Sequence, residues 1–329
     1  MIGSIMPKRI VIATHGHCFD GLCSAVMFTR LMRHIHPNEV FTYRYISCGY
    51  APGQNGVDPK LLCGDINAIL DFRFSTAPQL TWYFDHHVSA FPSDEDRSVF
   101  AKAIENPDRR MFHDGTYGSC TKLIADVGQA MFGLDLEPTR ELVRWADMID
   151  SASFPSAETA VARKEPVLQM MSVVEHFGDD LFLAELAIRL MDEPLEKVAA
   201  SPNIQRLYEP LGRGQEVFVK QVTERAKESD GVVVVDLSDI NLEVAGKFVT
   251  YALYPNSVYS VMLSRSKTKC KISIGYNPWC NQERKHNIAQ ICERHGGGGH
   301  PVVGAIAVPV EDLERAKTLV TEIAQELRG

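Results

Sequence analysis

Apolar and polar positions follow two different periods in the first third of the chain. Residues 9–15 are a run of β-branched and apolar side chains that predicts a buried strand, and residues 20–35 place apolar side chains at helical spacing. Three more strand-like runs follow at 41–47, 67–74 and 80–87. Strands interleaved with helices are typical of a parallel sheet, so we expect an N-terminal α/β domain.

The middle of the chain is helical by its apolar spacing, and strand signals return in the last hundred residues. The polar stretch between these two regions predicts a connecting helix that is interrupted near Gly212 and Gly214. The sequence therefore predicts two α/β domains, residues 1–200 and a smaller one of residues 230–329. A linker helix over 201–229 joins them.

Composition narrows the class of protein. The chain has 329 residues, 45% hydrophobic and 23% charged, which is enough to form two cores and is typical of a globular protein. Its formal net charge of -8 argues against non-specific adhesion to nucleic acid, so we expect no binding to long duplexes. The eight cysteines contain no CxxC pair, so neither a zinc ribbon nor a dithiol redox site is indicated.

The distribution of apolar residues also bears on location. No stretch approaches the roughly 18–20 apolar residues that a membrane helix needs, so we expect no membrane partner. The first residues run straight into a strand pattern without a cleavable signal, and we therefore expect a cytoplasmic protein. A homodimer is possible, but no residue of the sequence argues for one.

Polar clusters follow three of the predicted strands. Residues 15–20 contain two histidines and an aspartate, Asp71 interrupts the third strand-like run, and residues 85–87 read Asp-His-His. Because ligands of parallel sheets gather beyond the carboxyl ends of the strands, we expect these groups to lie together. Several carboxylates and imidazoles at one place can hold a pair of divalent cations, which suits phosphoester hydrolysis.

Five stretches carry a family resemblance: "HGHCFDGLCSA", "ILDF", "FDHHVS", "WADMID" and "GGGGHPVVGAIAV". In this order they resemble the DHH phosphoesterase family, in the branch with the DHH-associated C-terminal domain that includes oligoribonuclease and phosphoadenosine-phosphate phosphatase-like proteins. The resemblance extends from about residue 9 to about residue 310. It implies a parallel-sheet N-terminal DHH domain, a smaller α/β C-terminal domain and an active site in the cleft between them.

The resemblance implies two divalent metal ions, with manganese as the favoured ion. The metal ligands that it implies are His15, His17, Cys18, Asp20, Asp71, His86 and Asp147. Asp150 is an alternate to Asp147, since the two lie three apart on one helix face.

The first motif departs from the family pattern His-x-x-x-Asp-x-Asp. Asp20 fits the second aspartate, but Cys18 stands at the first, and His15 and His17 lie just out of register with the histidine. Which of these three residues are ligands stays open. A thiolate ligand would move the metal preference toward zinc or iron.

Catalytic roles are implied for Asp85, His86 and His87, with His86 as a direct metal ligand and His87 as a substrate phosphate contact. The substrate-binding positions that we expect are Gly297, Gly298, Gly299, His300, Asn277 and Arg265. The family's Ser-x-Arg strand has Gly275 in place of the arginine, and Asn277 or Arg265 could compensate.

The implied function is hydrolysis of a phosphodiester or phosphomonoester in a nucleotide or short oligonucleotide. Because the first motif and the position of Gly275 depart from the family, a catalytically impaired nucleotide-binding or sensing protein is the alternative. Inorganic pyrophosphatase chemistry shares the N-terminal motifs, but the glycine-rich C-terminal motif argues against it.

Overall fold

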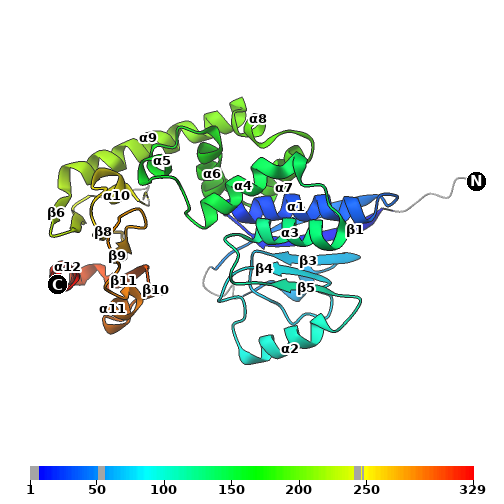
Figure 1. Cartoon of the computed structure of the whole chain (residues 1–329), viewed down its shortest axis with the longest axis horizontal. Helices are drawn as coiled ribbons and strands as arrows, with labels where there is room; N and C mark the ends of the chain where they lie inside the picture. The colour runs from blue at the N-terminus through cyan, green and yellow to red at the C-terminus, as the bar shows by residue number, and fades with distance from the viewer. Residues whose placement is uncertain (1–6, 51–55, 241–245, 247) are drawn as a thin grey trace, which may run out of the picture. The chain divides into compact units, whose positions relative to one another are not determined.

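The computed structural model describes residues 7–50, 56–240, 246 and 248–329, which form two compact units (Figure 1). Unit 1 consists of Met1–Ser153 and Glu165–Tyr208, and unit 2 consists of Phe154–Lys164 and Glu209–Gly329. Within the described residues, every helix is too short or too polar to cross a membrane.

A parallel sheet forms the centre of unit 1. Its strands are β1 (Lys8–His15), β2 (Phe41–Cys48), β3 (Ile66–Leu70), β4 (Trp82–Asp85) and β5 (Arg110–His113). Its helices are α1 (Phe19–Ile35), α2 (Asp94–Ile104), α3 (Cys120–Phe132), α4 (Arg140–Asp150), α6 (Pro166–Phe177), α7 (Asp180–Asp192) and α8 (Leu195–Ala199), with short 3₁₀ turns η1 (Pro59–Leu61) and η2 (Glu137–Thr139). The strand order is β2-β1-β3-β4-β5, and each neighbouring pair is parallel.

Helices cover both faces of this sheet, with α1 and α3 on one face and α2 on the other (Figure 1). Strand β1 is therefore buried on both sides, and Ile10, Val11, Ile12 and Ala13 are all fully buried. The predicted strands at 9–15 and 41–47 and the helix at 20–35 are confirmed.

The strands β1, β3 and β4 end side by side at the carboxyl edge of the sheet. Thr14 pairs with Leu70, and Leu70 pairs with Phe84. The predicted strand at 67–74 is wrong beyond Leu70, because Asp71 has a left-handed backbone (φ +54°) that cannot continue a strand. Strand β4 ends at Asp85, so the two histidines after it are free of strand alternation.

Unit 2 contains a six-stranded mixed sheet of order β10-β11-β9-β8-β7-β6. The strands are β6 (Lys227–Ser229), β7 (Val232–Leu237), β8 (Tyr259–Arg265), β9 (Lys269–Tyr276), β10 (Gly298–His300) and β11 (Val303–Pro309). The helices are α5 (Ala157–Ala162), α10 (Val249–Leu253), α11 (Ile288–Arg294) and α12 (Leu313–Arg328), with a 3₁₀ turn η3 (Val310–Asp312). Residues of α11 and α12 pack on the sheet in one hydrophobic core.

Three details of the predicted organisation differ from the structure. Helix α9 (Pro202–Arg225) runs without interruption through Gly212 and Gly214, and it ends before strand β6 rather than at residue 229. Its second half stays helical because Phe218 and Val222 are buried in the core of unit 2. Phe154–Lys164, placed by the sequence in the first domain, belongs to unit 2.

Gly21 is the point at which helix α1 meets the end of strand β1. A Cβ atom at Gly21 would lie 2.1 Å from the backbone oxygen of His15. We expect Gly21→Ala to destabilise unit 1 by about 1–3 kcal/mol, because the backbone must shift to relieve this overlap. Urea unfolding monitored by circular dichroism measures the change.

The matched control is Gly128→Ala in helix α3, where the added Cβ would lie 3.0 Å from Leu134 Cδ2, the end of a flexible side chain. Helix propensity offsets that contact, so we expect a change within about 1 kcal/mol. Equal effects of the two substitutions would show that the approach of α1 to β1 is not a rigid constraint.

Candidate metal centre

Carboxylates, imidazoles and one thiol converge at the carboxyl edge of the sheet in unit 1. They form three overlapping groups in which the candidate ligand atoms lie within 4.8 Å of one another. The groups are His15, Cys18 and Asp71; Asp71, His86 and His87; and Asp20, His86 and Asp150. We call these residues together the ligand cluster.

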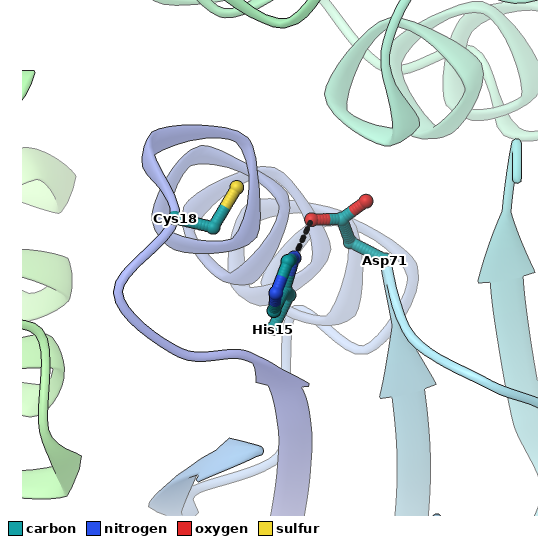
Figure 2. Close-up of side chains that lie close together, drawn as sticks. All are labelled: His15, Cys18 and Asp71. Atoms are coloured by element: carbon teal, nitrogen blue, oxygen red, sulfur yellow. Dashed lines mark ion pairs between the residues drawn. The ribbon is translucent and has the colours of Figure 1, made fainter. Parts of the chain in front are cut away.

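Asp71 is the centre of the ligand cluster. Its side chain is fully buried, and its two oxygens face different neighbours. Oδ2 lies 3.7 Å from His15 Nδ1 (Figure 2), whereas Oδ1 lies 3.5 Å from His86 Nε2 and 3.6 Å from His87 Nδ1. These separations are too long for hydrogen bonds. The carboxylate is therefore positioned to bridge two ligand groups.

Unsatisfied polar atoms are concentrated at this point. Within the described residues, both oxygens of Asp71 and Nε2 of His86 are buried without a hydrogen-bond partner. His86 Nε2 lies 3.2 Å from Asp150 Oδ2, but without hydrogen-bond geometry. Buried polar groups are rarely left in this state, and cations held on the two sides of Asp71 would satisfy these atoms.

The charges of the ligand cluster perturb its pKa values in opposite directions. Burial opposes ionisation of Asp71, but the imidazoles of His15 and His86 hold the pKa of Asp71 at about 2. Burial disfavours the charged form of His86, yet the carboxylates of Asp150 and Asp71 raise the pKa of His86 to about 11. A proton on His86 thus provides part of the positive charge that the carboxylates require, and metal binding must displace it.

Asp85 orients the two histidines that follow it. Its Oδ1 accepts hydrogen bonds from the backbone N–H groups of His86 (2.8 Å) and His87 (3.2 Å) and lies 2.7 Å from His87 Nδ1. Its Oδ2 accepts from the hydroxyl of Tyr83. These contacts occupy both oxygens of Asp85 and fix the orientation of His87. The catalytic role of Asp85 stays a prediction.

Backbone groups hold two other members of the ligand cluster. His86 Nδ1 lies 3.1 Å from the carbonyl oxygen of Tyr117, which directs Nε2 toward the carboxylates. The buried side chain of Asp20 accepts from Cys120 N (2.8 Å) and Thr121 N (3.0 Å), in the first turn of helix α3. Burial and the charges of Asp71 and Asp150 raise the pKa of Asp20, which a cation would reverse.

The sequence left open which of His15, His17 and Cys18 are metal ligands, and whether Asp147 or Asp150 is one. The structure distinguishes among them. His15 and Cys18 belong to the ligand cluster, but His17 Nδ1 lies 3.2 Å from the carbonyl oxygen of Glu175. Asp147 Oδ1 accepts from the hydroxyl of Ser119, whereas Asp150 joins the ligand cluster. The geometry thus favours the alternate over the first choice and argues against His17.

The predicted substrate-binding residues lie in unit 2, and two of them do not suit that role. Asn277 is fully buried, and its amide group bonds Pro255 O, Ser257 O and Trp279 N. Both amide hydrogens are therefore used, and the side chain has no exposed surface through which a ligand could reach it.

Arg265 lies at the far end of strand β8 from the glycine run. Arg265 pairs with Cys270, whereas Gly275, at the other end of β9, pairs with Val303, the partner of His300. Five residues along a strand correspond to about 17 Å, too far for Arg265 and His300 to share a small ligand.

The glycine run has a structural role in strand packing. A Cβ atom on Gly297 would lie 2.2 Å from Ala305 O, and one on Gly299 would lie 2.3 Å from Val303 O. Gly297 N donates to Cys292 O and is therefore unavailable to an anion. Gly298 and His300 are exposed in strand β10, so a ligand can reach them.

Sequence reasoning missed an aromatic and a cation beside the ligand cluster. The ring of Tyr50 lies 5.4 Å from the ring of His15 and is half exposed. The guanidinium of Arg73 lies 4.9 Å from the centre of the Tyr50 ring. Arg73 could have been found from the sequence, because it lies two residues after Asp71 at the same edge of the sheet. Tyr50 could not, because it lies in the loop after β2, outside any motif or periodic pattern.

The donors of the ligand cluster suit divalent transition metals. Carboxylate oxygens and imidazole nitrogens are ligands for manganese, iron and zinc, and ligand distances near 2.0–2.2 Å place donors of one ion about 3–4 Å apart. The separations of 3.2–3.8 Å between His86 Nε2 and its three carboxylates match that spacing. The residues therefore fit a metal centre.

No protein-family model and no curated protein matches this sequence. Solved structures with similar folds include PggH, a pGpG-specific phosphodiesterase from Vibrio cholerae, with a TM-score of 0.67, 18% identity and coverage of 96% of this chain and 98% of that one. Another is a DHH domain from a protein described as a member of a family of ribosomal proteins, with a TM-score of 0.62, 12% identity and coverage of 98% and 88%.

RecJ in complex with Mn²⁺ from Thermus thermophilus has a TM-score of 0.54 and 12% identity, and the match covers 97% of this chain and 52% of RecJ. The chain thus spans about half of RecJ but nearly all of the two structures above. These similarities confirm the two-domain α/β fold predicted from the sequence.

Asp147 and Asp150 make a matched pair for testing the metal centre. We expect Asp150→Asn to weaken Mn²⁺ binding by at least about 10–100-fold, because a ligand is lost where even supporting groups have effects of that size. Asp147→Asn should leave binding unchanged, since Asp147 bonds Ser119 instead. Isothermal titration calorimetry of the metal-free protein measures both. The reverse result would make Asp147 the ligand.

Proposed function

From the fold that this chain shares with the DHH phosphoesterases, and from its ligand cluster, we propose that the protein is a divalent-metal-dependent phosphoesterase. Its substrate is a nucleotide or a short oligonucleotide. The observation that carries the proposal is the buried carboxylate of Asp71, whose two unpaired oxygens face opposite sides of the ligand cluster. A carboxylate in this arrangement supports two cations, for which manganese is the favoured choice.

Bound divalent ions supply Lewis-acid charge that activates water and neutralises phosphate oxygens. The chain's own contribution is to hold the ligands and to add a positive group. His87 Nδ1 is fixed by Asp85, which leaves Nε2 for a phosphate oxygen. Burial opposes protonation of His87, but the neighbouring carboxylates of Asp85 and Asp71 raise its pKa, which favours the charged form that a phosphate requires.

The substrate class follows from the surroundings of the ligand cluster and from the similar structures. The half-exposed ring of Tyr50 lies beside His15, and the guanidinium of Arg73 lies over this ring, which places a positive charge and an aromatic edge next to the ligand cluster. PggH is described as specific for pGpG, a linear dinucleotide, which makes pGpG the first substrate to test. Contact between His300 and the substrate stays a prediction from the resemblance.

Activity should depend on the metal and on Asp71. We expect the protein to hydrolyse pGpG in the presence of Mn²⁺, to lose activity in chelator and to recover when Mn²⁺ is added. Asp71→Asn should lower kcat by at least about a thousandfold, because several kcal/mol of charge stabilisation depend on the metal. Asparagine also accepts the left-handed backbone at this position, so we expect the fold to be preserved.

Product release measured by chromatography, with a panel of pGpG, 3′-phosphoadenosine 5′-phosphate and a long single-stranded RNA, checks this prediction. Asp147→Asn is the active control. Hydrolysis that persists in chelator, or full activity of Asp71→Asn, would contradict the proposed centre. Binding of pGpG without turnover would favour the sensing alternative.

Tyr50 should determine affinity for the nucleotide. We expect Tyr50→Leu to raise KM for pGpG about tenfold with little change in kcat, because the ring holds the guanidinium of Arg73 beside the site and a cation–π contact contributes about 0.5–2 kcal/mol. Tyr50→Phe keeps the ring and should behave like the unmodified protein. Steady-state kinetics separate the two constants. An unchanged KM in Tyr50→Leu would remove this residue from the substrate site.

A further inference from the structure

The position of Cys18 is not explained by the helix that it precedes. Cys18 is the N-cap of helix α1, with extended backbone angles, and its side chain makes no capping hydrogen bond to the described first turn. Serine, threonine, aspartate and asparagine are the side chains that stabilise this position. The thiol instead points to the space shared with His15 and Asp71 (Figure 2).

An independent observation marks that space as a cation site. Asp71 is fully buried, and within the described residues its oxygens lack hydrogen-bond partners. Its Oδ2 is on the side of His15 and Cys18, while Oδ1 is on the side of His86. The carboxylate therefore requires positive charge on the thiol side as well as on the histidine side.

The two sides differ in chemistry. His15, Cys18 and Asp71 present one nitrogen, one sulfur and one oxygen, and we call them the thiol set. Asp20, His86 and Asp150 present two carboxylates and one nitrogen, and we call them the carboxylate set. Sulfur ligands favour zinc and other soft ions, whereas carboxylates suit manganese and magnesium.

We propose that the two sets bind different ions, the thiol set a zinc-like ion through the sulfur of Cys18 and the carboxylate set a harder ion such as Mn²⁺. This inference rests on the proposed two-metal centre. Zinc binds more tightly than manganese even to nitrogen and oxygen ligands. The inference is therefore that the preference for zinc over manganese is larger at the thiol set than at the carboxylate set. Coordination takes the thiol as thiolate, and its proton passes to solvent.

A neighbouring cysteine supplies the control. Cys120 is fully buried beside Asp20, but its sulfur lies 3.3 Å from the carbonyl oxygen of Phe84 and belongs to neither set. Cys120→Ser keeps a hydrogen-bond donor at that position. Because the sulfur of Cys120 lies outside the thiol set, Cys120→Ser should keep the bond between cobalt and the sulfur of Cys18.

The first test is titration of the metal-free full-length protein with Co²⁺, followed by absorption in the near ultraviolet. We expect an intense sulfur-to-cobalt charge-transfer band that saturates with one equivalent of ion. Cys18→Ser and Cys18→Asp should lose the band, while Cys120→Ser keeps it. Absence of the band in the unmodified protein, or its persistence in Cys18→Ser, would overturn the proposal.

Competition between Zn²⁺ and Mn²⁺, measured by elemental analysis after dialysis, is the second test. In Cys18→Asp the preference for zinc should fall by about tenfold or more at one site and stay unchanged at the other. Parallel assays of pGpG hydrolysis separate the two proposals. Hydrolysis without the cobalt band would reject the thiol set as a metal site but not the phosphoesterase. The band without hydrolysis would reject the phosphoesterase but not the thiol set.

Discussion

Burial of one carboxylate without compensating hydrogen bonds is the constraint on which the site depends. Asp71 lies at the end of the central strand β3 with no exposed surface, and both of its oxygens lack hydrogen-bond partners among the described residues. Keeping a charge in such a place costs several kcal/mol unless opposite charge surrounds it. The left-handed backbone of Asp71 adds strain, which chains tolerate mainly where function requires it. A bound cation would offset this unfavourable free energy of burial and strain.

The surrounding elements hold the other ligands rigidly around that carboxylate. The carbonyl oxygen of Tyr117 fixes the ring of His86, Asp85 fixes His87, and the first turn of α3 fixes Asp20. Each support comes from backbone or from a buried side chain, so the fold itself orders these ligands. Such preorganisation avoids the entropy cost of ordering side chains during binding.

The periodicity of the sequence predicted the sheet well and the ends of its strands poorly. Strand β1 was predictable because both faces are buried and the run is uniformly apolar. The end of β3 was not, since the left-handed backbone of Asp71 leaves no trace in composition. The choice between Asp147 and Asp150 was equally hidden, because one helix face carries both, and they differ only in tertiary neighbours: Ser119 for Asp147, and Asp20 and His86 for Asp150. Asn277 resembled a ligand contact by type, although its amide holds a loop together.

The first motif shows how a departure from a family pattern can preserve a site. His15 is one residue closer to Asp20 than the pattern expects, yet both reach the ligand cluster. The loop between them absorbs the shift: Gly16 lies so close to Ser47 that no Cβ would fit, and His17 adopts a left-handed backbone and donates to Gly178 O. With the loop tied down on this side, Cys18 is the residue left to face Asp71. Counted from Asp20, Cys18 stands where the pattern has its first aspartate, so a sulfur replaces an oxygen donor there and, as a ligand, would make the two sides of the Asp71 carboxylate chemically unequal.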